Sequence, residues 1–184
     1  MALFGRGRRK GVAGDRLSAL STARVTLEAE LGLKPGGVAA VCFKPLAPGE
    51  FVRAENELQE ALDAVAMESQ SRIERRSDEF GFEWLIIRDR DFEELVTTVH
   101  LVGAELQKRG FGPQLLAAMF ELKWGEQPVY FIYGYKSGAF WPFVPTGEKE
   151  RDNDRELELK AKLENELPIE PDLSKWFGLF EAPL

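Results

Sequence analysis

The chain has 184 residues, of which 44% are apolar and 11% aromatic, and it carries a net charge of −7 at pH 7. This charge argues against general nucleic-acid binding, which needs a basic surface, and the single cysteine excludes an internal disulfide. No apolar run approaches the roughly 20 residues that span a bilayer, and no apolar stretch follows the basic start as it would in a signal peptide. We therefore expect a soluble, cytoplasmic protein in a reducing compartment.

The first ten residues contain four cations and two glycines, a composition that opposes helix formation. We predict a flexible basic tail over residues 1–14, followed by a single α+β domain over residues 15–184. The alternative for the tail is attraction of Arg6–Lys10 to anionic lipid, which implies at most weak, peripheral membrane contact.

Apolar residues at helical spacing predict four helices. They are expected over residues 15–31, 50–68, 91–110 and 153–167. Asp91 with Glu94, and Asn153 with Glu156, have the spacing of a capping box at a helix start. Gly110 follows its helix in the position where a left-handed residue ends one.

Runs of aromatic and β-branched residues between turn residues predict six strands. They are expected over residues 37–43, 71–78, 82–88, 114–124, 129–135 and 139–144. The second run is charged and polar, which is typical of an edge strand. The last three runs are separated by breaks too short for a parallel crossover, so they should form an antiparallel meander. The predicted fold is α+β, with a mainly antiparallel sheet and helices packed on one face.

Few residues indicate chemistry. His100 is the only histidine, and no Cys, His or acidic residue lies at metal-ligand spacing from it, so we expect no metal site. Cys42 lies in an apolar run with Lys44 two residues further on; a reactive thiol needs a cationic, partly exposed setting, whereas a buried structural thiol is the simpler interpretation. No phosphate loop, dinucleotide motif or nucleophile elbow is present, so we expect neither catalytic residues nor a cofactor.

The aromatic residues allow two interpretations, a packed core or an exposed apolar patch that marks a partner site. Trp141 and Phe143 share one face of a strand, Phe140 points to the opposite face, and Trp176 and Phe177 lie near the C-terminus. If the protein binds a partner, these five are the expected apolar anchors, because aromatics dominate binding hot spots. The charges expected at the rim are Lys44, Lys136 and Arg151.

Six stretches in a fixed order also carry a family resemblance: Val41–Pro45, Gly110–Leu116, Tyr135–Pro145, Arg151–Asn153, Ile169–Leu173 and Trp176-Phe177. In order and spacing they resemble the PspA-associated protein PspAB family, over almost the whole chain. The resemblance implies a cytoplasmic protein of the phage-shock, membrane-stress system. It implies a coiled-coil, PspA-like membrane-remodelling protein as the partner, with a membrane metalloprotease of the HtpX type as a second candidate. It adds no catalytic residue.

We therefore expect a non-enzymatic adaptor or accessory protein of the PspA-linked response that acts by binding another protein. Helices around an antiparallel sheet are also similar to secretion-chaperone-like domains, on fold analogy alone. The alternative is a small-molecule-binding or hydrolytic enzyme that uses Cys42 or His100. A deep polar pocket with either residue beside a carboxylate would favour the enzyme, and a flat apolar groove would favour the adaptor.

Overall fold

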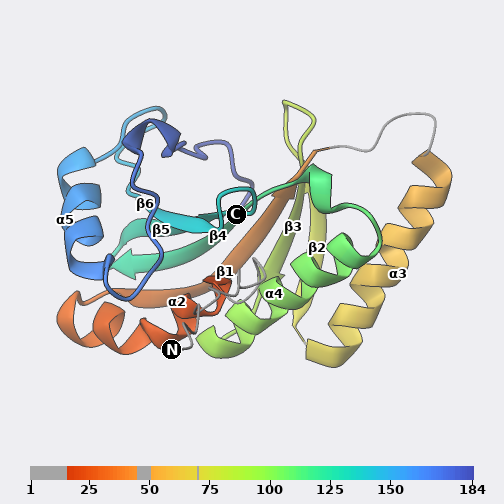
Figure 1. The fold of residues 1–184 in the computed structure, drawn as a ribbon, viewed down its shortest axis with the longest axis horizontal. Helices are drawn as coiled ribbons and strands as arrows, with labels where there is room; N and C mark the ends of the chain where they lie inside the picture. The colour runs from red at the N-terminus through yellow and green to blue at the C-terminus, as the bar shows by residue number, and fades with distance from the viewer. Residues whose placement is uncertain (1–15, 45–50, 70) are drawn as a thin grey trace, which may run out of the picture.

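A six-stranded antiparallel sheet organises the structure, a computed structural model that describes residues 16–44, 51–69 and 71–184. The strand order is β2-β3-β1-β4-β5-β6 (Figure 1). The strands are β1 (Lys34–Phe43), β2 (Arg72–Ser77), β3 (Glu83–Arg88), β4 (Leu115–Trp124), β5 (Gln127–Gly134) and β6 (Ala139–Phe143). The helical elements are α2 (Ala19–Thr22), η1 (Thr26–Glu30), α3 (Phe51–Ser69), α4 (Phe92–Lys108), η2 (Gly112–Gln114), α5 (Asn153–Leu163) and η3 (Leu173–Lys175).

The predicted α+β class and antiparallel sheet are confirmed. The strands β4, β5 and β6 form the expected meander through two antiparallel hairpins. The central strand β1 joins this meander to β3, because it pairs antiparallel with both β4 and β3. The charged strand β2 pairs with β3 and forms one edge of the sheet, as predicted. The predicted tail over residues 1–14 lies outside the described residues, so the division into tail and domain stays a prediction.

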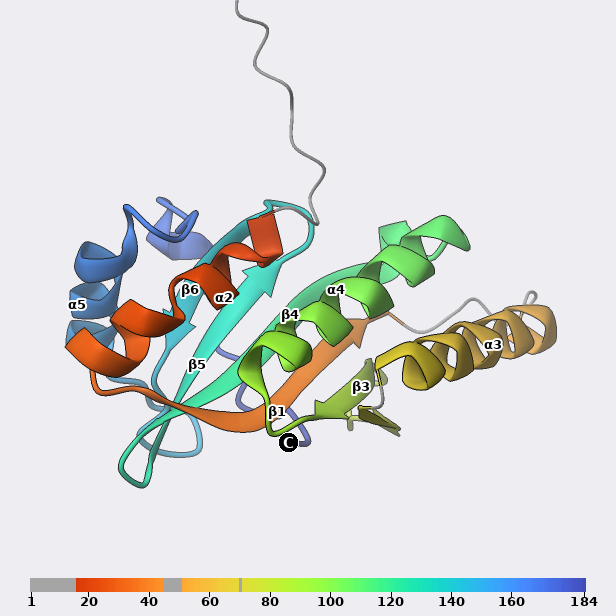
Figure 2. The same cartoon turned by 90° about the horizontal axis from the view of Figure 1, so that it is seen from below.

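The helices lie on one face of the sheet, which was also predicted (Figure 2). The best-defined of them, α4, packs on β1 and β3. The Asp91 carboxylate caps it by accepting hydrogen bonds from the amides of Glu93 and Glu94, at 2.9 and 3.1 Å. It is followed by Gly110, whose φ of 90° allows the Phe111 amide to donate to the Leu106 carbonyl at 2.8 Å. Apolar side chains from α2, η1, α3, α4 and α5 share one core with the facing strand residues.

The opposite face of the sheet, here called the second face, is also buried. Side chains alternate along β1, so Ala39 and Val41 face the helices whereas Ala40 and Cys42 point to the second face. No described helix contributes to the two apolar clusters on this face. Its cover is the C-terminal segment Phe177–Leu184, which we call the strap. In Figure 2 the C-terminus lies on the other side of β1 from α2 and α4.

Two predicted helices differ from the structure. The one over residues 15–31 is interrupted: α2 is short and is followed by the π-helical turn η1, although Leu20 and Leu27 are buried as the spacing requires. The capping box of α5 is wrong. Asp152, not Asn153, caps the helix by accepting from the Arg155 amide at 3.0 Å, and Glu156 turns inward to tertiary partners.

Candidate partner-binding groove

An apolar groove of about 590 Å³ lies over the β4–β6 part of the second face. It is lined by the first residues of β4, by the end of β5, the turn after it and β6, and by the segment before and within the strap. The lining residues are Leu116, Ala117, Gly134, Lys136, Ser137, Trp141, Glu170, Lys175, Phe177 and Leu179. Elements distant in sequence therefore build one surface.

The floor of the groove depends on a bulge and a glycine. Between β1 and β4 the register shifts, so that Cys42 pairs with Ala117 and Phe43 with Leu115, which leaves Leu116 as the extra residue that lines the groove. On β5, a Cβ at Gly134 would come within 3.0 Å of Trp141 Cζ3. The glycine thus leaves room for the indole ring to lie over β5.

Two aromatic residues of the groove have different exposure. Trp141 is 6% exposed, and its Nε1 donates to the Phe177 carbonyl at 2.9 Å, which fixes the start of the strap. The Phe177 side chain itself is 64% exposed. A large, exposed aromatic beside an apolar floor is a feature of protein-binding surfaces.

Lysines form the rim. Lys136 lines the groove and also a neighbouring depression of about 760 Å³, which Lys44 and Tyr135 line too. Lys44 and Lys136 are exposed and form no ion pair with another described residue. Lys175, by contrast, forms an ion pair, because its Nζ lies 3.5 Å from Asp172 Oδ2. The one acid in the lining, Glu170, is buried and lies 3.8 Å from Lys175 Nζ, so, among the described residues, the exposed, unpaired charges at the rim are those of Lys44 and Lys136.

Tyr135 lines the neighbouring depression and was not among the expected site residues. Its hydroxyl is buried and has no hydrogen-bond partner among the described residues. Burial raises the pKa of Tyr135, and the charge of Tyr133 adds to this, so the hydroxyl stays protonated. Its position just after β5, beside the turn, is the sequence feature that points to it.

The five aromatic residues that we expect as apolar anchors, if the protein binds a partner, differ in exposure. Four of the five are buried: Phe140, Trp141, Phe143 and Trp176 are 0%, 6%, 1% and 8% exposed. The reason is that both faces of β6 are covered. Of the eight expected partner-site residues, those in the groove or the neighbouring depression are Trp141, Phe177, Lys136 and Lys44, and those outside both are Phe140, Phe143, Trp176 and Arg151.

Arg151 has an internal role instead of a free charge. Its guanidinium pairs with the Glu156 carboxylate at 2.8 Å and donates to the Trp176 carbonyl at 2.7 Å. It also lies 5.2 Å from the centre of the Phe143 ring. Glu156 is 2% exposed and accepts from the Val144 amide at 2.8 Å. This cluster joins β6, α5 and the segment that leads into the strap.

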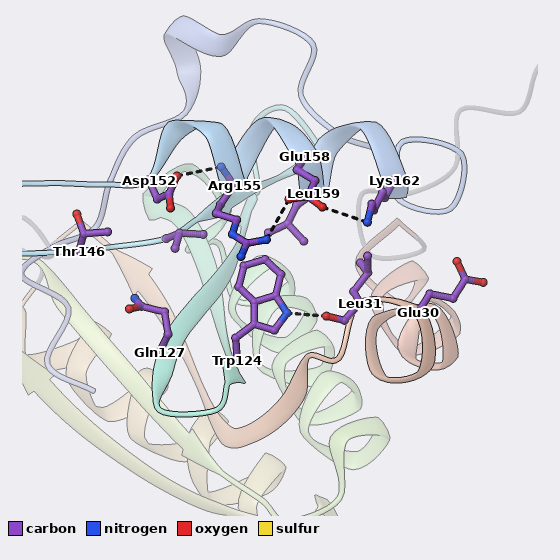
Figure 3. A pocket seen from close by; sticks show the side chains of 11 residues that line it. Glu30, Leu31, Trp124, Gln127, Thr146, Asp152, Arg155, Glu158, Leu159 and Lys162 are labelled. Atoms are coloured by element: carbon purple, nitrogen blue, oxygen red, sulfur yellow. Dashed lines mark hydrogen bonds and ion pairs between the residues drawn. The ribbon is translucent and has the colours of Figure 1, made fainter.

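A second, polar pocket of about 370 Å³ lies between η1, the end of β4 and α5 (Figure 3). Three of its charged side chains are paired with one another. Glu158 binds Arg155 and Lys162, both at 3.1 Å, and these hydrogen bonds lower the pKa of Glu158. Trp124 donates from Nε1 to the Leu31 carbonyl at 2.6 Å, and the Arg155 guanidinium lies over its ring at 4.9 Å. These contacts tie η1, β4 and α5 together, so the charged and aromatic side chains of this pocket have a structural role.

Neither residue of the enzyme alternative lies in these pockets. Cys42 is 4% exposed, and burial raises the pKa of its thiol to about 12, with the charge of Asp78 as a smaller cause. The thiol is therefore protonated at neutral pH. His100 is half-buried on α4. Within the described ranges, no group of three or more His, Cys, Asp or Glu residues could hold a metal ion.

Fold and site together define an α+β protein with an apolar groove that is rimmed by lysines. None of its described helices is long and apolar enough to cross a membrane. The chain belongs to the PspA associated protein B (PspAB) family, whose family model matches residues 1–184, the whole chain. No curated protein and no solved structure matches it. Membership fits a PspA-related accessory role and links the protein to the stress response.

Proposed function

We propose that this protein is a non-enzymatic, cytoplasmic adaptor of the PspA-linked stress response, and that its groove binds a segment of a PspA-like coiled-coil protein. The observation that carries the proposal is the pairing of an exposed Phe177 with a lysine-rimmed apolar floor. Protonation and burial of the Cys42 thiol support a non-enzymatic role.

The chemistry of the groove specifies the segment. Its apolar floor favours apolar side chains, and Lys44 and Lys136 favour acidic residues beside them. Helices of coiled coils present a stripe of apolar residues flanked by charged ones, and such helices bind apolar grooves. We therefore expect an amphipathic segment with acidic residues at the edges of its apolar stripe.

The test is the affinity of the purified protein for a purified PspA-like protein of the same genome, measured by calorimetry. Phe177→Ala should weaken binding about ten- to a hundredfold, the range of a hot-spot aromatic. Lys136→Glu should weaken it and reduce its dependence on salt. Lys108→Glu is the matched control, because its side chain is 77% exposed on α4, on the helical face. Absence of binding by the unmodified protein, or equal effects of all three changes, would refute the proposal.

The two other contacts implied by the resemblance are proposals to test separately. A detergent-solubilised HtpX-type protease in the same assay tests the second protein partner. Co-sedimentation with anionic liposomes, with and without residues 1–11, tests the basic tail; equal binding of both forms would exclude a role for Arg6–Lys10.

A further inference from the structure

The strap lies on the second face as a bound peptide would. Leu179, Ala182 and Leu184 pack against both apolar clusters of this face. The Phe180 ring meets the Phe143 ring edge-on, with centroids 4.9 Å apart. Each of these four strap residues is half-buried.

Few polar contacts hold the strap. At its start, the Trp141 indole donates to the Phe177 carbonyl at 2.9 Å. Beyond Phe177 the backbone hydrogen bonds stay within the strap, from Ala182 to Leu179 at 3.3 Å and from Leu184 to Ala182 at 2.9 Å. Among the described residues, apolar contact alone therefore joins Gly178–Leu184 to the sheet. Such a segment opens at lower cost than one built into a hydrogen-bonded ladder.

The strap covers a surface that would otherwise be a large apolar patch. Ala40, Cys42, Trp84 and Ile86 are at most 4% exposed, although the helices lie on the other face. Apolar patches of this kind mark protein-binding surfaces when they are uncovered. The second face is thus a preformed site for an apolar segment, with the strap as its present occupant.

A group of arginines lies directly beside this site. On the edge strand β2, Arg76 is opposite Trp84, and Arg72 is opposite Arg88 of β3. Opposite residues of an antiparallel pair point to the same face, so these arginines lie on the second face, next to the cluster that Leu184 contacts. Two acids lie beside them. The pKa of Glu74 is lowered by its hydrogen bond to Arg76 and by the charges of Arg72 and Arg88. The Asp78 carboxylate accepts a hydrogen bond from Trp84 Nε1 at 2.8 Å.

We propose that the second face is a docking site for an apolar partner segment that displaces Gly178–Leu184 of the strap, while Trp141 keeps holding Phe177, and continues as acidic residues onto Arg72, Arg76 and Arg88. The segment matches the strap where it replaces it, with bulky apolar residues at the positions of Leu179, Phe180 and Leu184. That this partner is PspA-like rests on the proposed function. The site itself is testable without any partner protein.

Cys42 provides the assay, because it is the only cysteine and packs against strap residues. We would measure the rate at which a maleimide labels Cys42 in the full-length protein. Leu184→Asp should raise this rate at least about tenfold while lowering Tm by only a few degrees, since opening is local. Leu173→Asp is the control, because Leu173 is 50% exposed in the turn before the strap; it should leave the rate unchanged.

Peptides then test whether the opened face accepts a segment. A synthetic peptide of residues 178–184 should slow labelling of the Leu184→Asp protein. The same peptide with two aspartates added at its C-terminus should do so at several-fold lower concentration, and Arg76→Glu should abolish this advantage. If the variant does not fold, slowing of the basal labelling of the unmodified protein by the extended peptide is the same test.

Three results would overturn the proposal. Labelling of Leu184→Asp at the unmodified rate would show that the strap is not the cover. If the labelling rate of Cys42 rose only as much as the loss of global stability predicts, the strap would unfold together with the core and not by itself. Failure of excess peptide to slow labelling would show that the face accepts no segment. None of these results depends on whether a PspA-like protein binds, so failure here and failure of the proposed function are distinguishable.

Discussion

Glu156 is 2% exposed, and its carboxylate accepts hydrogen bonds from the Val144 amide at 2.8 Å and from Arg151 Nε at 2.9 Å. Glu156→Ala would leave the Arg151 guanidinium, in a side chain only 18% exposed, without a counter-charge. Removing one partner of a buried ion pair costs about 3–5 kcal/mol, and this includes the unpaired amide. For a protein of this size about 1 kcal/mol corresponds to roughly 2–4 °C, so Tm should fall by roughly 6–20 °C.

Urea unfolding followed by circular dichroism measures this loss. The double variant Arg151→Met with Glu156→Leu should recover part of the stability, because it leaves no unpaired buried charge, although the Val144 amide and the Trp176 carbonyl still lose their partners. Glu158→Ala is the matched control on the same helix: its carboxylate is 43% exposed and pairs with Arg155 at 3.1 Å, so its loss should be barely measurable. Equal losses for Glu156→Ala and Glu158→Ala would refute the assignment of a buried pair.

Three further predictions follow from burial, close packing and helix capping. Because the folded protein holds the Cys42 proton up to a pKa of about 12, whereas the unfolded thiol releases it near 9, stability should fall between these pH values. The free energy of unfolding, measured with urea, should fall with pH by about 1.4 kcal/mol per pH unit more steeply in the unmodified protein than in Cys42→Ala. Identical slopes in the two proteins would disprove the burial argument. Gly134→Ala should cost about 1–3 kcal/mol in the same assay and shift tryptophan fluorescence, since the new Cβ meets the Trp141 ring at 3.0 Å; an unchanged spectrum would contradict this. Asp152→Ala should cost about 1 kcal/mol and Asn153→Ala almost nothing, because Asp152 is the cap, and the reverse order would restore the predicted capping box.

Local patterns predicted the strands and the cap of α4 because their causes are local. The meander follows from breaks that are too short for a crossover, and the structure has the same three strands within two residues at each end. Asp91 was identifiable as a cap because its partners, the amides of Glu93 and Glu94, lie within the next three residues. The charged strand β2 was identifiable as an edge because its composition already excludes burial on both sides.

Features that depend on contacts between residues distant in sequence could not be predicted in the same way. Alternation correctly placed Phe140 opposite to Trp141 and Phe143, but it could not show that an irregular C-terminal segment returns to cover the second face. Asn153 and Glu156 have capping-box spacing, yet the Glu156 carboxylate makes stronger, charge-assisted contacts with Arg151. Four of the eight expected partner-site residues, Phe140, Trp141, Phe143 and Trp176, are therefore buried. The exposed ones, Lys44, Lys136 and Phe177, all lie outside the strands.

The groove and the strap are physically linked, because Leu179 lines the groove and also packs against both clusters of the second face. If the partner binds only when the strap is open, its apparent affinity equals the intrinsic affinity multiplied by the open fraction. Labelling of Cys42 reports the same fraction, since the thiol reacts only in the open form.

Leu184→Asp should therefore raise the affinity for the partner by the same factor by which it raises the labelling rate. The comparison needs only calorimetry and labelling under one buffer condition. A lower affinity would mean that the strap is part of the binding surface, and an unchanged affinity would mean that the partner uses the groove alone. Equality of the two factors would identify strap opening as the step that controls access to the second face, because one open fraction then sets both the labelling rate and the apparent affinity.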